Sequence, residues 1–254
     1  MEHLSEKRQR LLATSPYSPL AEDRFVFGGR QFDAEEIVDT LSDLLTEERR
    51  ERIEDVLDGR TYNVAAVVEG VVNMGNVSAV MRSAEALGFQ PFHVVTGGEK
   101  FKDSRRTSQG AEKWLDIHQW KSPEECISYL KGEQYQIIVT HLDESSIPIN
   151  DVDFTRKTAL VFGNERDGVS VQMVQLSDVR CVVPMSGFVR SFNISVAAAV
   201  ALYHARTDRI ARRGSHGDLT EQERCDLRAA FYLSSVRHAR RILSDEGGEG
   251  REAG

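Results

Sequence analysis

Three short polar segments of the sequence carry side chains that could do chemistry. Arg82 stands six residues after Asn76 in NMGNVSAVMRSAEALG, and a guanidinium can clamp a phosphate through paired hydrogen bonds. Glu165 lies in GNERDGVS, which follows an expected strand, so its carboxylate would face a ligand bound at that strand end. Ser191 and Asn193 precede an apolar helix, whose free N–H groups suit polar or anionic ligands. These five residues are therefore candidates for contact with such a ligand.

Each candidate also has an ordinary structural explanation. Asn193 or Ser195 is a good N-cap for the helix that follows. Arg82 lies off the apolar stripe of its own helix, as a solvated arginine does, and Asn76 can cap the start of that helix. The segment GNERDGVS can serve as a tight turn between a strand and a helix. Capping alone does not explain Ser191, so the polar run before the last helix suggests a further role.

Two familiar nucleotide-binding motifs are missing from the sequence. Gly163 and Gly168 have the spacing of a P-loop, but Val169 stands where that motif requires a lysine. No G-x-G-x-x-G follows the first expected strand. The sequence therefore argues against a nucleoside-triphosphate cradle and against a generic Rossmann-type oxidoreductase.

The central part of the chain alternates between expected strands and expected helices. Its short, β-branched apolar runs predict buried strands, and Ser122 with Glu125 forms the pattern of a capping box. The strand–helix–strand order predicts a parallel α/β sheet with ligands bound outside the carboxyl ends of the strands. The expected strands span residues 63–71, 92–96, 114–120, 136–142, 158–163 and 181–185, and the expected helices span 76–88, 122–132 and about 193–213.

The sequence changes character on both sides of this central part. Residues 1 to about 60 are acidic and carry apolar residues at helical spacing. A further amphipathic helical region is expected over residues 219–243. The last residues, 244–254 (SDEGGEGREAG), have the composition of a disordered tail.

Length and composition favour one medium domain with extensions over two full domains. The chain has 254 residues, of which 40% are hydrophobic and 28% charged. No apolar run is long enough to cross a bilayer, and the charged N-terminus lacks the apolar centre of a signal peptide. Three scattered cysteines favour a reducing compartment, and seven histidines without ligand spacing predict no metal site.

The charge balance is acidic, with a formal net charge of −8 and a pI of about 5.5. This balance argues against a protein that coats nucleic acid, which would usually be basic. Two local basic patches occur at residues 100–106 (KFKDSRR) and 206–213 (RTDRIARR). Each patch taken alone is typical of a solvated surface.

The three polar segments occur together and in order, and this combination resembles a known family. NMGNVSAVMRSAEALGF, LVFGNERDGVS and VPMSGFVRSFNISVAAAVALYHA resemble the signature motifs of the SPOUT superfamily, in particular the TrmH-type RNA 2′-O-ribose methyltransferases. The resemblance covers roughly residues 62–206. SQGAEKW and THLDESSIPINDVDF look more like the tRNA-modifying branch, which methylates a guanosine of the tRNA D-loop.

The resemblance implies a fold, a cofactor and a set of partners. The expected fold is a parallel α/β sheet whose C-terminal part forms a trefoil knot, at residues 62–206, with helical extensions at residues 1–61 and 207–254. The family binds S-adenosylmethionine in the knot and works as a homodimer, and we expect both properties of this protein. We also expect a tRNA substrate, a cytoplasmic location and no metal. An rRNA substrate and a non-catalytic RNA-binding role remain the alternatives. The five family-typical residues at the reactive positions favour the enzyme.

The resemblance also assigns roles to individual residues. Arg82 would meet the RNA phosphate and help to remove the proton of the 2′-hydroxyl. Because a free guanidinium is a very poor base, with a pKa far above neutral pH, orientation of the phosphate and ribose is the better supported role. Arg190 and Phe192 stand where relatives often have Gln and Leu, and Arg190 could touch RNA or be a plain surface residue. The assigned residues are Asn76, Arg82, Glu165, Ser191 and Asn193 for catalysis; Thr140, Leu142, Gly163, Val183, Met185 and Phe192 for the cofactor; and Lys102, Arg105, Arg106, Arg190 and Arg206 for RNA.

Overall fold

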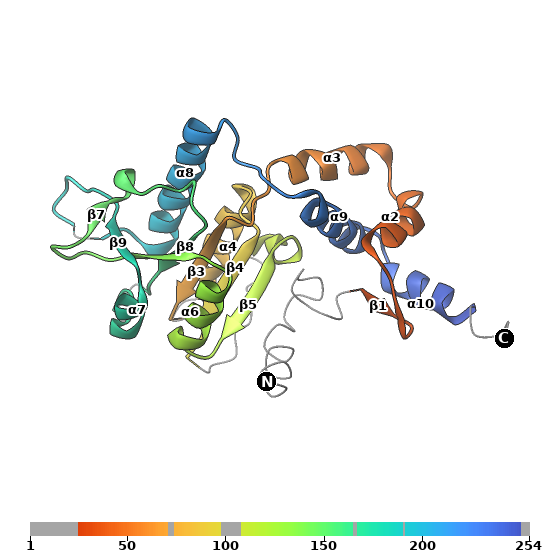
Figure 1. Ribbon diagram of the computed structural model, residues 1–254, viewed down its shortest axis with the longest axis horizontal. Coiled ribbons are helices and arrows are strands. Elements are labelled where there is room, and N and C mark those ends of the chain that lie inside the picture. The colour runs from red at the N-terminus through yellow and green to blue at the C-terminus, as the bar shows by residue number, and fades with distance from the viewer. Residues whose placement is uncertain (1–24, 71–73, 98–107, 165–166, 190, 250–254) are drawn as a thin grey trace. The chain divides into compact units, whose positions relative to one another are not determined.

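The computed structural model describes residues 25–70, 74–97, 108–164, 167–189 and 191–249 (Figure 1). The chain divides into two compact units, each described here by itself. The larger unit is Thr61–Asp218, and the smaller unit combines Met1–Arg60 with Leu219–Gly254. The predicted boundary between residues 206 and 207 falls inside a helix of the larger unit.

A seven-stranded sheet forms the centre of the larger unit. All of its neighbouring strands pair in parallel, so the predicted parallel α/β sheet is confirmed. One expected strand is displaced. The sequence predicts it over residues 181–185, whereas the observed strand spans Val179–Val182. The strands, in their order across the sheet, are β5 (Asp116–Trp120), β4 (Pro91–Val95), β3 (Val64–Glu69), β8 (Thr158–Phe162), β6 (Gln136–Thr140), β9 (Val179–Val182) and β7 (Ile147–Pro148).

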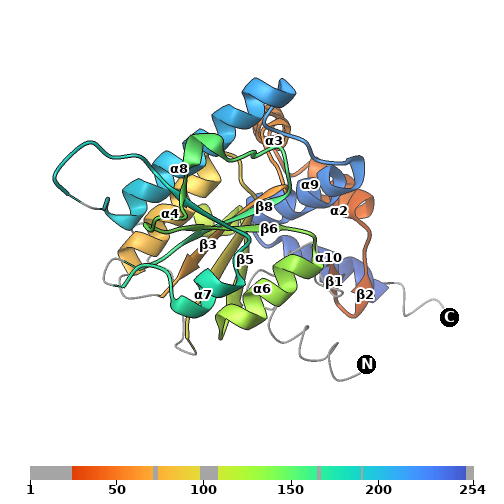
Figure 2. The ribbon, with the colours of Figure 1, turned by 60° about the vertical axis from the view of Figure 1, so that its left-hand side comes forward.

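Helices cover both faces of this sheet, as the two ribbon views show (Figures 1 and 2). The central strands are apolar on both sides because each face packs against a helical layer. Val64, Ala66 and Val68 of β3 join the core under α4 (Met74–Ala86) and α8 (Ile194–Arg213). The alternate β3 residues, Ala65 and Val67, join the core under α6 (Pro123–Gly132) and α7 (Val171–Leu176).

Side-chain caps set the start of several helices. Asn193 caps α8, as the sequence predicts. Ser122 caps α6 by accepting the Glu125 N–H, but the Glu125 carboxylate accepts the Lys121 N–H, so the capping box differs from the predicted pattern. Helix α4 begins at Met74, so Asn76 lies inside its first turn and not at its N-cap. Two short 3-10 helices, η1 (Ala111–Lys113) and η2 (Ile149–Asp151), complete the larger unit.

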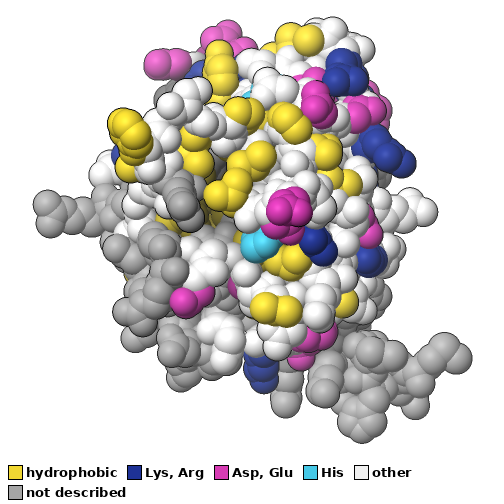
Figure 3. Space-filling view, turned by 90° about the vertical axis from the view of Figure 1, so that its left-hand side faces the viewer, with side chains coloured by type: hydrophobic (Ala, Val, Ile, Leu, Met, Phe, Trp, Pro, Cys, Tyr) yellow, Lys and Arg dark blue, Asp and Glu magenta, His cyan; other side chains and the backbone are white. Residues whose placement is uncertain are grey.

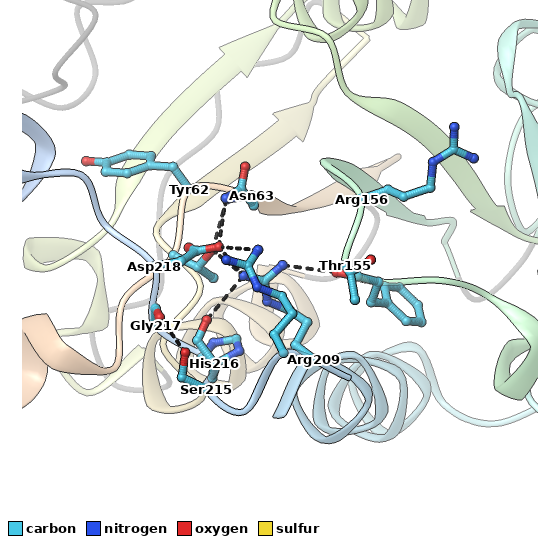
Figure 4. Close-up of polar contacts among 12 residues, drawn as sticks. Tyr62, Asn63, Thr155, Arg156, Arg209, Ser215, His216, Gly217 and Asp218 are labelled. Atoms are coloured by element: carbon cyan, nitrogen blue, oxygen red, sulfur yellow. Dashed lines mark hydrogen bonds and ion pairs between the residues drawn. The ribbon is translucent and has the colours of Figure 1, made fainter. Parts of the chain in front are cut away.

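A buried ion pair lies at the amino ends of the central strands (Figure 4). Arg209 of α8 is fully buried and pairs with Asp218. Its guanidinium also donates to the Phe154 carbonyl at 3.0 Å, ahead of β8, and to the Thr61 hydroxyl at 3.3 Å, ahead of β3. The Asn63 amide donates to the same Asp218 carboxylate at 2.8 Å. The network therefore connects three stretches that lie far apart in the sequence, around residues 61–63, 154 and 209–218.

The smaller unit contains a hairpin that the helical prediction for residues 1–60 did not include. Strands β1 (Val26–Phe27) and β2 (Arg30–Gln31) pair antiparallel across Gly28 and Gly29, both with positive φ. A Gly-Gly pair is the two-residue turn of such hairpins, so the signal was present in the sequence. The helices of this unit are α2 (Ala34–Ser42), α3 (Glu47–Asp58), α9 (Glu221–Ser235) and α10 (Ala239–Glu249).

The predicted disordered tail is wrong for residues 244–249, which continue helix α10. Composition gave no sign of this because the helix depends on tertiary packing of its first half. Ala239 and Leu243 are buried, and the Ser244 backbone packs so closely on Gly28 that a Cβ there would lie 2.7 Å from the Ser244 oxygen. No helix in the described part of the chain is long and apolar enough to span a membrane.

Candidate active site

A pocket opens where three neighbouring strands end at the carboxyl edge of the sheet. Its walls come from the ends of β6, β8 and β9 and from the start of α8. Its volume of about 360 Å³ lies within the range of about 300–1,000 Å³ that is usual for small-molecule sites. The lining residues are Thr140, His141, Leu142, Phe162, Gly163, Asn164, Gly168, Val169, Cys181, Val182, Val183, Met185, Ser191, Phe192, Ile194 and Ala197.

The two glycines with P-loop spacing close the loop that forms one wall of this pocket. Asn164 and Gly168 exchange two backbone hydrogen bonds of 3.0 Å, which pinches the loop at its neck. A Cβ on Gly163 would lie 2.0 Å from the Gly168 carbonyl carbon, so no other residue fits without opening the neck. Gly168 has a φ of +69°, which L side chains rarely adopt. The spacing of the glycines therefore serves loop closure and pocket shape.

The described pocket wall combines apolar side chains with a few polar residues, namely Thr140, His141, Asn164 and Ser191, and contains no Asp, Glu, Lys or Arg. The Thr140 hydroxyl donates to the Val161 carbonyl at 3.0 Å, so it is engaged in the sheet. Burial raises the pKa of the Cys181 thiol to about 12, which keeps this thiol neutral. Such a wall suits a ligand that is held mainly by shape and by backbone hydrogen bonds.

The loop after β6 is fixed from outside the pocket by Asp143. This carboxylate accepts hydrogen bonds from the Ser145 hydroxyl and the Ser145 N–H and from Arg180 of β9, at 2.7, 2.8 and 2.9 Å. These bonds, with Ser145 first, hold the pKa of Asp143 well below its usual range. The charged carboxylate therefore ties the segment that carries His141 and Leu142 to the neighbouring strand.

The structure brings together all six residues that the resemblance assigned to the cofactor. They come from segments separated by up to 52 residues in the chain, and each of them lines the same pocket. Ser191, assigned to catalysis, lines it as well. The six residues are Thr140, Leu142, Gly163, Val183, Met185 and Phe192.

The other residues assigned to catalysis do not share one location in the structure. Arg82 is exposed on α4, beyond the apolar stripe that packs on the sheet. The Asn193 side-chain oxygen accepts from the Ser195 N–H and hydroxyl at 2.9 and 2.6 Å, so the ordinary capping explanation holds for it. Glu165 lies outside the described residues.

Most residues assigned to RNA also lie outside the described residues, namely Lys102, Arg105, Arg106 and Arg190. Arg206 is partly exposed on α8. The basic run that begins there is less available than its sequence suggests, because Arg209 is buried, Arg212 pairs with Asp208 and Arg213 pairs with Asp218.

Sequence reasoning missed several members of the pocket wall. His141 and Asn164 lie at or just past the end of a predicted strand, so the rule that ligands bind at carboxyl strand ends could have found them. Cys181 could not be found in this way, because it begins the strand predicted over residues 181–185, whereas it lies near the end of the observed strand β9. Ile194 and Ala197 face the pocket from the first turn of α8. Their role carries no sequence signal, because apolar residues at these positions also fit a plain core helix.

The fold and pocket define a class: a parallel α/β protein with a small-molecule site at the carboxyl edge of its sheet. The model of the SpoU rRNA Methylase family matches residues 63–203. A tRNA (guanosine(18)-2′-O)-methyltransferase of Borreliella burgdorferi is 31% identical over 201 residues, covering 79% of this chain and 92% of the relative. The chain therefore belongs to the SpoU rRNA methylase family, as the resemblance indicated.

Two solved structures are similar in fold and sequence. The A. aeolicus TrmH/SpoU tRNA modifying enzyme aligns with a TM-score of 0.69 and 31% identity, covering 75% of this chain and 98% of that one. The SpoU methyltransferase AviRb from Streptomyces viridochromogenes, in complex with the cofactor AdoMet, aligns with a TM-score of 0.53 and 28% identity, covering 61% and 62% of the two chains.

Proposed function

We propose that the protein is an S-adenosylmethionine-dependent tRNA 2′-O-methyltransferase that modifies guanosine-18 in the D-loop. The observation that carries this proposal is the convergence of six family cofactor positions on one pocket at the strand ends. The named activity of the Borreliella burgdorferi relative, which this chain covers almost throughout, supports the tRNA substrate. The methyltransferase domain is proposed to span residues 62–206, flanked by residues 1–61 and 207–254.

The pocket residues fit S-adenosylmethionine. The cavity has the size of a small-molecule site, and its described wall combines apolar side chains with polar residues such as Asn164 and Ser191. Thr140, Leu142, Gly163, Val183, Met185 and Phe192 would hold the cofactor. When bound, S-adenosylmethionine supplies an electrophilic methyl group on a sulfonium. The AdoMet-bound relative supports this assignment.

The protein's own residues would act chiefly by positioning the RNA. Arg82, exposed on α4, would hold the phosphate next to the reacting ribose through its fork of N–H donors. Ser191 at the pocket wall and Asn193 at the start of α8 would face the ribose. The Asn193 oxygen is already used in capping, which leaves its amide N–H groups as donors. Holding the 2′-hydroxyl in line with the methyl group would supply most of the rate.

A homodimer and a trefoil knot complete the proposal. Hydrophobic side chains gather on the face shown in Figure 3, and the larger unit exposes apolar residues along α8 and the segment before it. Exposed apolar patches of this kind mark interaction sites, and a second copy would cover this one. The knot is supported by β6 lying between β8 and β9, with the pocket formed by the segments after all three. The apolar residues are Phe188, Val189, Phe192, Val196, Val200 and Tyr203.

The location proposed for the protein is the cytoplasm. The scattered free cysteines support a reducing compartment, since none of the three forms a disulfide within the described residues. The activity named for the tRNA-modifying relative supports the same location.

A methyl-transfer assay with mapping tests the function. The protein is incubated with labelled S-adenosylmethionine and separate tRNA and rRNA transcripts, and the position of any 2′-O-methyl group is determined. The expected result is a single methylated guanosine in the tRNA D-loop. Labelling of rRNA alone would support the rRNA alternative. Cofactor binding without transfer to any RNA would contradict the enzyme and favour a non-catalytic RNA-binding role.

A further inference from the structure

Glu69 is a buried carboxylate that lies outside the pocket and has none of the roles described above. It is the last residue of β3, and its exposed fraction is only 6%. Its Oε2 atom accepts a hydrogen bond of 2.8 Å from the Ser170 N–H. Burial of a carboxylate is costly unless it is paired, so a side chain of this kind needs a structural or functional reason.

The bond from Glu69 holds one end of the loop that forms a pocket wall. Ser170 is the last residue of that loop and the N-cap of α7, where its hydroxyl accepts the Met173 N–H at 3.1 Å. Gly70, which directly follows β3, lies against the other end of the same loop. A Cβ on Gly70 would lie 2.7 Å from the side-chain nitrogen, Nδ2, of Asn164. The end of β3 therefore contacts the loop at both of its ends.

The described residues at the two ends of this loop are held by further contacts. Asn164 and Gly168 close its neck through paired backbone hydrogen bonds, and Val169 is buried. Gly163, Asn164, Gly168 and Val169 all line the pocket. A shift at Ser170 would therefore move the pocket wall, because the closed neck transmits it.

We propose that Glu69 is a positioning residue for the cofactor pocket. Its carboxyl group anchors the Gly163–Ser170 loop to β3 through a part-buried hydrogen bond of 2.8 Å from the Ser170 N–H. Cofactor affinity thus depends on a side chain that does not line the pocket. The identity of the ligand rests on the proposed function, but the anchoring of the loop does not.

The test compares removal of the Glu69 carboxyl group with removal of another buried carboxyl group of the same sheet. Glu69→Met removes the carboxylate with a similar side-chain length, and Glu69→Gln keeps a neutral acceptor. Asp116→Leu is the matched control. Asp116 on β5 is 4% exposed and accepts a hydrogen bond of 2.7 Å from the Tyr62 hydroxyl. Like Glu69, Asp116 does not line the pocket.

Two quantities are measured on each full-length variant: amide hydrogen exchange over residues 163–170 without ligand, and the Kd of S-adenosylmethionine by calorimetry. Glu69→Met is expected to speed exchange in the loop and to raise the Kd about tenfold, as for loss of one buried hydrogen bond. Glu69→Gln should restore most of the affinity. Asp116→Leu should lower the melting temperature and leave both quantities near wild type.

The outcomes separate this proposal from the proposed function. Unchanged loop exchange in Glu69→Met, or equal losses of affinity in Glu69→Met and Asp116→Leu, would overturn the positioning role. If wild-type protein does not bind S-adenosylmethionine, the proposed function fails. The exchange measurement without ligand still decides whether Glu69 anchors the loop.

Discussion

The two ends of the central strands handle polar groups in opposite ways. At the amino ends, the guanidinium of Arg209 is buried, paired with Asp218 and bonded to segments ahead of β3 and β8 (Figure 4). At the carboxyl ends, the described pocket wall has no charged side chain, and its shape comes from glycines and backbone hydrogen bonds. Helix α8 takes part in both regions, with Ile194 at the pocket and Arg209 in the ion network.

The difference indicates that the two ends of helix α8 have different roles. A buried ion pair with fixed partners resists rearrangement, because breaking it leaves an uncompensated charge in a low-dielectric interior. A wall of backbone and apolar groups leaves space for a ligand and keeps its shape without one. We therefore expect substitutions at the amino ends to change stability, and substitutions at the carboxyl ends to change ligand binding.

The largest expected effect is on stability at the amino ends. Arg209→Met should lower the free energy of unfolding by up to about 3–5 kcal/mol, because Asp218 would lose its fully buried partner and keep only the more exposed Arg213 and the Asn63 amide. Urea unfolding measures this loss. The cofactor Kd of the folded variant should stay within a few-fold of wild type. A large loss of cofactor affinity with little loss of stability would contradict the assignment of a stabilising role to the amino ends.

The next effect is on the chemistry. Arg82→Ala should reduce methyl transfer by about 10²–10³-fold, the usual cost of removing one electrostatic group from a transition state. Because Arg82 is exposed on α4, the melting temperature and cofactor Kd should not change. Arg241→Ala, at a side chain that is 82% exposed, is the matched control. Methyl transfer at the wild-type rate by Arg82→Ala would show that Arg82 takes no part in the reaction.

Substitution of Gly163 tests the pocket wall directly. Gly163→Ala should raise the cofactor Kd by about tenfold or more, because the new Cβ would force the neck of the loop open at a cost of about 1–3 kcal/mol. Calorimetric titration measures the affinity. Gly132→Ala is the control, since a Cβ there meets nothing within 4 Å. Equal affinities in the two variants would show that the tight neck does not shape the site.

A separate effect, on the pH dependence of stability, concerns a buried histidine away from both ends. Burial lowers the pKa of His118 to about 4, and its ring stacks on that of His93 at 4.8 Å between centroids. The unfolded chain binds a proton below pH 6.5 and the folded chain does not, so stability falls by about 1.4 kcal/mol per pH unit between about pH 6.5 and 4.

Replacing the histidine should remove its share of this dependence. His118→Phe should flatten the slope of unfolding free energy against pH in that window, measured by urea unfolding at several pH values. Gly132→Ala, which changes no titratable group, should leave the slope unchanged. An unchanged slope in His118→Phe would contradict the assignment of a neutral buried ring.

The sheet and the pocket differ in how far sequence could predict them. The buried strands were predictable because they are short β-branched runs between helices, and the carboxyl-edge rule located the pocket at their ends. The two-residue strand β7 and the helical continuation at residues 244–249 were not, because both depend on neighbours distant in sequence. The pairing of Arg209 with Asp218 and Asn63 is of the same kind.

The candidate site needed more than periodicity. Local reasoning identified Ser191 and Asn193 as polar residues before a helix, and the structure shows capping for one and a pocket position for the other. The cofactor positions came only from family resemblance, because backbone-lined pockets leave few side-chain signals. The anchoring carboxylates Glu69 and Asp143 have no motif of their own and became visible through their hydrogen bonds.

Hydrogen exchange of the unmodified protein, with and without S-adenosylmethionine, tests the central claim most directly. The account predicts slower exchange on ligand addition in three separate segments at the carboxyl edge, around residues 140–142, 163–169 and 181–197. Exchange around Thr61–Asn63 and His216–Asp218, at the amino ends, should not change. Protection confined to the amino-end segments, or absent from the three pocket segments, would contradict a cofactor site at this edge of the sheet.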